Sequence, residues 1–190
     1  MRSTIYLALA CGAMMAIPAS AAENGCPPGS YTVVTSPDRS TLSILFDQFN
    51  LDPQAGGGAA LSKVCHISHP LALPPNMSLG VYKVDYRGFA KLGPSQQAAL
   101  EVKYSLGPHG NEHGRVFRRK VKGSHEGDYT FTENIGAGQM KRVGCGSDAK
   151  LDVTIGLALT GAGANAMASL DTSDGKSAAM VYHLNLKKCN

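Results

Sequence analysis

The sequence contains no tryptophan, and aromatic residues make up only 6% of its 190 residues. The lack of tryptophan weakens the case for a surface on which sugar rings stack. Beyond the N-terminal region no stretch is apolar enough to span a membrane, since a transmembrane helix needs roughly 20 apolar residues. No segment sustains a helical period, and there is no internal repeat or low-complexity tail. These absences argue against a helical, membrane-spanning or repeat protein.

Several motifs that carry enzymatic or metal chemistry are also missing. There is no G-x-S-x-G nucleophile elbow, and Gly56-Gly57-Gly58 lacks the lysine and hydroxyl residue of a phosphate-binding loop. Asp171-Thr-Ser-Asp174-Gly175 lacks the ligand spacing of a calcium loop. The cysteines are too widely spaced for the close C-x-x-C pairs of a zinc site. We therefore expect no catalytic residue and no cofactor.

The N-terminus has the anatomy of a secretory signal. Arg2 precedes an apolar run at 5–17, which ends in small residues that fit an A-x-A cleavage site. We expect cleavage after Ala21, or one residue later. A lipoprotein site at Cys11 is disfavoured, because the apolar run continues beyond that residue.

The remaining chain has the size of one domain. We predict a signal peptide over 1–21 and a single domain over 22–190, which is long enough to bury a core without a metal centre. The formal charge is +4, and loss of Arg2 lowers it by one. A net charge this small favours solubility and indicates no particular partner. We therefore do not expect nucleic acid as a partner.

Four cysteines remain in the expected mature chain: Cys26, Cys65, Cys145 and Cys189. An even number in an exported protein indicates disulfides, each contributing roughly 2–4 kcal/mol when it closes a long loop. Three pairings are possible. We favour Cys26 with Cys65 and Cys145 with Cys189. The second pair follows if a strand from about Lys150 runs antiparallel beside one that ends near Lys188.

The hydrophobic period along the chain is two. Apolar residues alternate with small or polar ones from Leu151 to Leu159, which is the pattern of a strand with one face on a core. Segments such as Ser36-Pro37-Asp38 and His125-Glu126-Gly127-Asp128 have turn composition. The pattern predicts about nine strands in an antiparallel β-sandwich. The other expected strands lie at 31–36, 42–46, 64–73, 79–90, 100–106, 115–122, 129–135 and 182–186.

One segment has the spacing of a zinc peptidase motif. His109, Glu112 and His113 fit H-x-x-E-H, in which a helix places both histidines beside the metal. Proline, asparagine and glycine surround these residues, so a surface turn is favoured over a helix. A metal-assisted hydrolase that uses them is kept as an alternative.

Two charged segments are candidate ligand-binding sites. Arg115, Arg118 and Lys120 belong to the only cationic run, in which Arg118, Lys120 and Lys122 would share one face of a strand. That stripe fits an anionic glycan, although cations on an edge strand also discourage pairing with another chain. Asp85 and Arg87 should point the same way, either to anchor a ligand or as a structural ion pair.

The chain resembles a secreted family catalogued as domain of unknown function 4360. The resemblance covers nearly the whole expected mature chain and rests on the four cysteines and the segment Asp85-Tyr86-Arg87-Gly88. Gly25-Cys26-Pro27 and the stretch SPDRSTLSILFD at 36–47 add to it. It implies an exported β-rich domain and supplies no activity, so no catalytic residue is carried over from it.

These observations favour a secreted or periplasmic, non-enzymatic module that acts in binding or at the cell surface. An extracellular glycan or a cell-surface component is the expected partner. The alternatives are the hydrolase and the binder of anionic glycan, which would use the cationic run.

Overall fold

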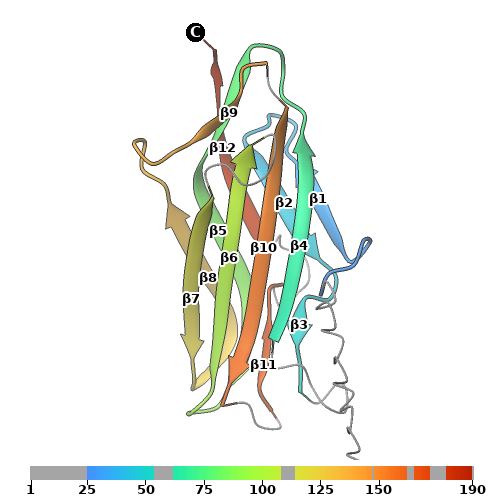
Figure 1. Ribbon diagram of the computed structural model, residues 1–190. Coiled ribbons are helices and arrows are strands. Elements are labelled where there is room, and N and C mark those ends of the chain that lie inside the picture. Colours follow the sequence, from blue (N-terminus) through green and yellow to red (C-terminus); the bar gives the residue numbers. More distant parts are fainter. Residues whose placement is uncertain are drawn as a thin grey trace, which may run out of the picture.

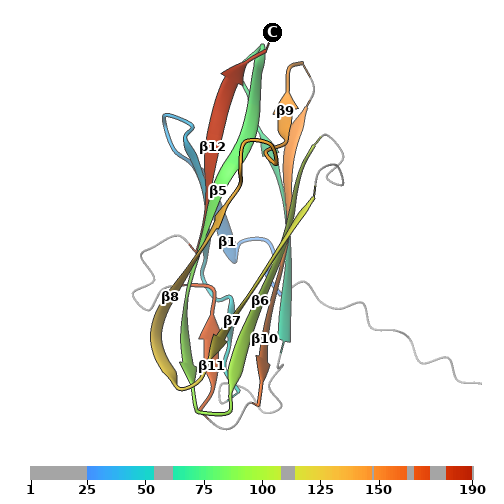
Figure 2. The same cartoon turned by 90° about the vertical axis from the view of Figure 1, so that its left-hand side faces the viewer.

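A computed structural model describes residues 25–53, 62–107, 114–146, 148–161, 165–171 and 179–189. These residues form twelve strands in two antiparallel sheets, and none of them is helical (Figure 1). Figure 2 shows the sheets edge-on as two layers. The predicted all-β antiparallel sandwich with two disulfides is confirmed. The described residues contain no helix of the length and hydropathy needed to cross a membrane.

The smaller sheet has four strands and faces the viewer in Figure 1. Its strands, in spatial order, are β4 (Ser62–Leu71), β10 (Ala149–Thr160), β6 (Gln97–Gly107) and β7 (Arg115–Lys122). Alternate residues of β10 are buried, as the period of two predicts. The intervening residues form the outer face of this sheet.

The larger sheet has eight strands, with β5 as its hub. The strand β12 lies between β2 and β5, and β5 also pairs with β8, β9 and β11. The strands are β1 (Tyr31–Thr35), β2 (Thr41–Phe46), β3 (Asn50–Leu51), β5 (Met77–Leu92), β8 (His125–Asn134), β9 (Arg142–Gly144), β11 (Met167–Ser169) and β12 (Met180–Lys188).

One core lies between the sheets. Its fully buried members include Leu42, Ile44, Tyr86, Ile155 and Tyr182, which come from both layers. Each lies at an inward position of its strand, so the period-two pattern of the sequence becomes the two inner faces.

One predicted turn is wrong. The segment His125-Glu126-Gly127-Asp128 has turn composition, but it forms the first part of β8 and pairs with β5. Only Gly123 and Ser124 connect β7 to β8. This short connection carries the chain from the smaller sheet to the larger one. Partners on β5 therefore override local turn preference.

The segment Asp85-Tyr86-Arg87-Gly88 lies in the middle of β5, and its glycine allows a close contact. A Cβ atom on Gly88 would collide with the Tyr129 ring and with the Ser169 carbonyl. The Tyr129 hydroxyl donates to that same carbonyl over 2.8 Å. Gly88 thus lets Tyr129 of β8 lie across β5 and link β8 to β11.

Both disulfides join the predicted partners, Cys26 with Cys65 and Cys145 with Cys189. The expected antiparallel pairing of the strands near Lys150 and Lys188 is wrong, because these strands, β10 and β12, belong to different sheets. Instead, Cys145 and Cys189 both lie beside the start of β5. Their backbone N–H groups donate to the carbonyls of Met77 and Asn76, respectively. These neighbouring carbonyls bring the two cysteines together.

Candidate functional site

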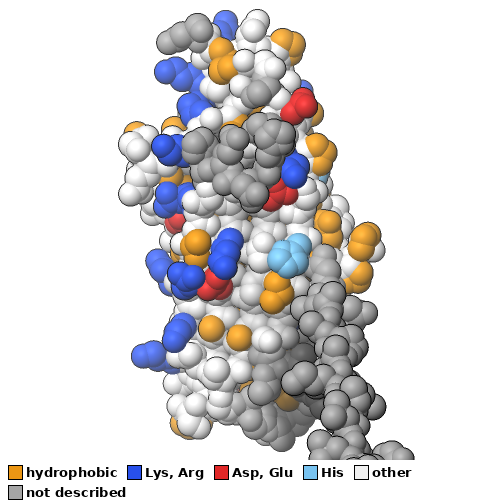
Figure 3. All heavy atoms as spheres, viewed as in Figure 1, with side chains coloured by type: hydrophobic (Ala, Val, Ile, Leu, Met, Phe, Trp, Pro, Cys, Tyr) orange, Lys and Arg blue, Asp and Glu red, His pale blue; other side chains and the backbone are white. Residues whose placement is uncertain are grey.

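The strongest candidate site is the outer face of the smaller sheet. Its strands are in register, so that outward residues form rows across the sheet. One row runs Val64, Gly156, Glu101 and Arg118, and the next runs Ser62, Ala158, Ala99 and Lys120. Figure 3 views this face, with Lys and Arg side chains gathered on its left, over β7, and hydrophobic side chains beside them.

The floor of this face is apolar and made of small residues. Gly156, Ala158 and Ala99 occupy outward positions of the two central strands, while longer side chains stand on the outer strands. The result is a shallow hollow of about 620 Å³, bounded by Val64 on one side and by Arg118 on the other. Val64 is 39% exposed. A ligand chain could therefore lie along the sheet between the outer strands.

The β7 side of the hollow is cationic. Arg118 Nε donates to Glu101 over 2.6 Å, and Lys103 pairs with the other oxygen of Glu101 at 3.1 Å. These hydrogen bonds, the one from Arg118 first, lower the pKa of Glu101. Lys120 and Lys122 have no carboxylate partner within the described ranges. The wall thus carries more positive charge than its single carboxylate offsets.

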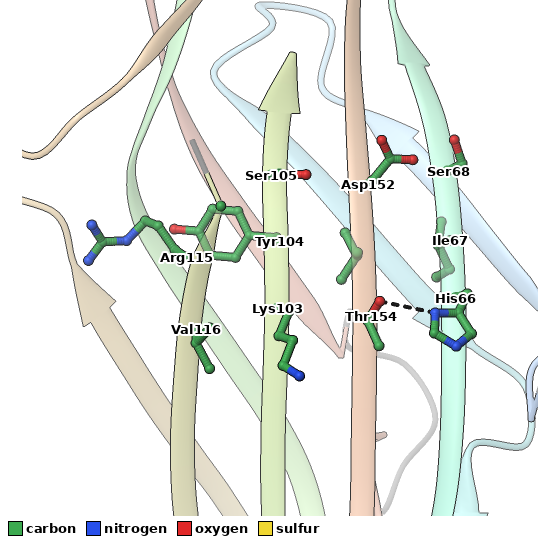
Figure 4. Close-up of a pocket in the computed structure, with 12 residues that line it drawn as sticks. His66, Ile67, Ser68, Lys103, Tyr104, Ser105, Arg115, Val116, Asp152 and Thr154 are labelled. Carbon is green, nitrogen blue, oxygen red and sulfur yellow. Dashed lines mark hydrogen bonds between the residues drawn. The ribbon is translucent and has the colours of Figure 1, made fainter. Parts of the chain in front are cut away.

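A second hollow, of about 510 Å³, continues the first along the sheet and is more polar (Figure 4). His66 Nδ1 lies 3.0 Å from the Thr154 hydroxyl, on neighbouring strands. Asp152 pairs with Lys150 at 3.1 Å and lies opposite Ser68. This end offers hydroxyl, imidazole and carboxylate groups, which suit the hydroxyls of a ligand.

The structure separates Arg115 from the other cations of its run. Arg115 points into the sandwich, and its Nε donates to Glu133 of β8 over 2.9 Å. The other carboxylate oxygen of Glu133 accepts from the Tyr86 hydroxyl at 3.1 Å. Burial lowers the pKa of Arg115, but hydrogen bonding to Glu133 and its charge outweigh burial, and the pKa is raised overall. Arg115 therefore ties the two sheets together and lies apart from Arg118, Lys120 and Lys122.

Asp85 lies on the outer face of the larger sheet, apart from the hollows. Its side chain is 9% exposed and pairs with Lys83 and His183 at 3.0 and 2.8 Å. Arg87 is half-buried and forms no ion pair with Asp85. The ion pair expected between Asp85 and Arg87 is therefore not formed, and Asp85 contacts Lys83 and His183 instead.

The candidate zinc residues His109, Glu112 and His113 lie outside the described residues. Within the described ranges no group of three or more His, Cys, Asp or Glu side chains is placed to hold a metal ion. The hydrolase remains a hypothesis from the sequence.

The sequence matches the family described as domain of unknown function (DUF4360) over residues 18–189. The chain belongs to the DUF4360 family. An uncharacterized secreted protein of Arthroderma benhamiae is 25% identical over 169 residues, which cover 87% of this chain and 67% of that protein.

Among solved structures, the DUF4360 chain is similar to TmCBM61, whose structure is a complex with β-1,4-galactotriose. The match has 16% identity and covers 85% of this chain and 84% of that one, with a TM-score of 0.33.

Sequence reasoning identified the cations of this DUF4360 site but missed its floor. Ala99, Gly156 and Ala158 are small residues at outward positions of well-predicted strands. Successive small outward residues on central strands are a signal that could have indicated a hollow. Their position beside Arg118 and Lys120 depends on cross-strand register, which the sequence does not reveal.

Proposed function

We propose that this DUF4360 protein is an extracytoplasmic, non-enzymatic binding module that takes an anionic polysaccharide along the outer face of its smaller sheet. The observation that carries the proposal is the cationic wall formed by Arg118, Lys120 and Lys122 beside a hollow with an apolar floor. Because Lys120 and Lys122 lack carboxylate partners in the described part of the chain, their charges are available to a ligand.

Location outside the cytoplasm is supported by three features. The N-terminal segment has the composition of a signal peptide, two disulfides cross-link the domain, and a relative is described as secreted. Disulfides persist in oxidising compartments and are rare in the cytosol. Polysaccharides of the cell surface or surroundings are ligands that such a protein would meet.

A repeating anionic polymer fits the spacing of the wall. Outward residues of a strand recur about every 7 Å, so Arg118, Lys120 and Lys122 span about 13 Å in a line. A polymer with an acidic group on successive units can meet several of these cations at once. Each contact is weak alone, so binding depends on their sum and on low ionic strength.

Recognition on this face must rely on charge rather than on stacking. The exposed large hydrophobic residues of the described chain are Val34, Val64, Tyr82 and Val116. Tyr82 is the only aromatic among them, and it belongs to β5 of the larger sheet. A neutral polysaccharide would therefore find no aromatic platform among the described residues of this face.

The test measures binding of polygalacturonate and dextran sulfate, with neutral dextran as the uncharged control. We expect binding to both polyanions at about 20 mM salt and a loss of at least tenfold in affinity at about 300 mM. The triple variant Arg118→Gln, Lys120→Gln, Lys122→Gln should lose at least tenfold in affinity at low salt.

A second triple variant controls for net charge. Lys91→Gln, Lys141→Gln, Lys188→Gln removes the same charge from residues outside this face. It should retain affinity within about threefold. Equal losses in both variants, binding insensitive to salt, or no binding to either polyanion would overturn the proposal. In those cases the cations of β7 are best explained as protection of an edge strand.

A further inference from the structure

A β-bulge on the opposite side of the sandwich turns a tyrosine outward. The pairing of β12 with β5 shifts there: His183 lies opposite Lys83, but Leu184 lies opposite Val81, so Tyr82 has no partner on β12. In an unbroken strand Tyr82 would share the inward side of Val84, which is fully buried. Instead its side chain is on the outside and the residue is 44% exposed. Bulges commonly re-aim a side chain in this way beside functional sites.

Beside Tyr82 lies a network centred on the carboxylate of Asp85. Its Oδ1 accepts from the Thr132 hydroxyl over 2.7 Å. Its Oδ2 lies 2.8 Å from His183 Nε2 and 3.0 Å from Lys83 Nζ. Three strands, β5, β8 and β12, contribute to this network. The side chains around Tyr82 are therefore held in place by the fold.

The network determines which His183 nitrogen carries the proton. Burial raises the pKa of Asp85, but hydrogen bonds from Thr132, Lys83 and His183 outweigh burial and lower it. Asp85 is thus ionised at neutral pH and can only accept hydrogen bonds. His183 Nε2 must therefore donate, which leaves Nδ1 of the neutral ring as an acceptor. The His183 and Tyr82 rings lie side by side, with their centres 5.9 Å apart.

We propose that Tyr82, His183 and Lys83 form a second ligand site, which binds one ring of a neutral saccharide. The exposed Tyr82 ring provides an apolar face for the carbon-bound hydrogens of the sugar. A sugar hydroxyl donates to His183 Nδ1, and a neighbouring hydroxyl accepts from the Lys83 ammonium. An aromatic face flanked by one acceptor and one donor suits a sugar ring, which has an apolar face and hydroxyls of both roles.

This site goes beyond the proposed polyanion surface and does not depend on it. Tyr82 and Asp85 are on the outer face of the larger sheet, whereas Arg118 and Lys120 are on that of the smaller one. A protein with both sites could hold an acidic polymer on one face and a neutral saccharide on the other.

The test uses the mature, disulfide-bonded protein and NMR titration with four neutral trisaccharides: cellotriose, chitotriose, mannotriose and β-1,4-galactotriose. We expect at least one of them to shift the Tyr82 ring and His183 imidazole signals. Tyr82→Ala should weaken that binding about tenfold or more, whereas Tyr82→Phe, which keeps the ring, should retain it within about threefold. Because Tyr82 is exposed, both variants should fold.

Val34→Ala is the matched control, because Val34 is 49% exposed and is also on the larger sheet. It should leave saccharide binding unchanged, as should the triple variant of Arg118, Lys120 and Lys122. The proposal is overturned if no trisaccharide shifts these signals, or if Tyr82→Ala binds as well as Val34→Ala. Either result leaves the polyanion proposal standing, since its probes and variants are different.

Discussion

The two outer faces of the sandwich use similar charged residues in different ways. On the larger sheet Asp85 is nearly buried, forms an ion pair with Lys83 and is hydrogen-bonded to His183. On the smaller sheet Lys120 and Lys122 point outward, with no carboxylate partner in the described part of the chain. We expect charges of the first kind to stabilise the fold and charges of the second kind to contribute little to it. The difference indicates which face can change its charges without unfolding.

The largest expected effect is on the stability of the larger sheet. Asp85→Ala leaves Thr132, Lys83 and His183 without their shared acceptor. We expect it to lower the free energy of unfolding by about 2–3 kcal/mol. Urea unfolding followed by circular dichroism, with the disulfides intact, measures this loss.

Glu101→Ala is the matched substitution on the smaller sheet. Glu101 also holds two cations, but its side chain is 38% exposed, so its loss should cost less than about 1 kcal/mol. Equal losses of unfolding free energy for Asp85→Ala and Glu101→Ala would show that the charges of the two faces stabilise the fold equally.

The same contrast predicts a dependence on pH. The pKa of Asp85 is lowered from its ordinary value of 3.8. A carboxyl whose pKa is lower in the folded state stabilises the fold above its unfolded pKa. That stability is lost as the pH falls through the folded value. We therefore expect the stability difference between the wild type and Asp85→Asn to be constant from pH 7 to 5 and to narrow below about pH 4. A difference that stays constant down to pH 2 would contradict this role of Asp85.

The cationic wall should be neutral for folding. Arg118→Gln, Lys120→Gln, Lys122→Gln should change the free energy of unfolding by less than about 1 kcal/mol, because two of the three side chains have no ion pair to lose. The urea midpoint compared with that of the wild type is the measurement. A large loss would place these cations among the residues that the fold requires.

The smallest expected effect concerns Glu101, which would compete with the proposed polyanion for the same cations. Glu101→Gln removes the charge that Arg118 and Lys103 now pair with. Affinity for dextran sulfate should rise by about two- to threefold at low salt. A fall in affinity would show that Glu101 positions Arg118 for the ligand rather than occupying it.

Much of the fold could be predicted because the period of two is a local signal. All nine expected strands are present, and β7 has the predicted bounds, Arg115–Lys122. The strands that were missed, β3, β9 and β11, have only two or three residues each, too few to show alternation. They exist because longer strands provide partners for them.

For the candidate sites, the sequence could predict only those features that depend on alternation within a single strand. Alternation placed Arg118, Lys120 and Lys122 on one face, and the structure agrees. It could not bring His183 to Asp85, since those residues are far apart in sequence and meet only through the pairing of β12 with β5. Nor could it indicate that Tyr82 points outward, because that depends on a bulge relative to β12.

The position of β12 has a consequence for how the chain folds. The last strand of the sequence lies between β2, near the beginning, and β5, which anchors the rest of the larger sheet. During synthesis β1 and β2 can form a hairpin early, but they cannot join the sheet until the C-terminal strand emerges. A chain cut before β12 would therefore lack the only strand that hydrogen-bonds β2 to β5 among the described residues, so the larger sheet would stay divided at that point even where its other strands had paired.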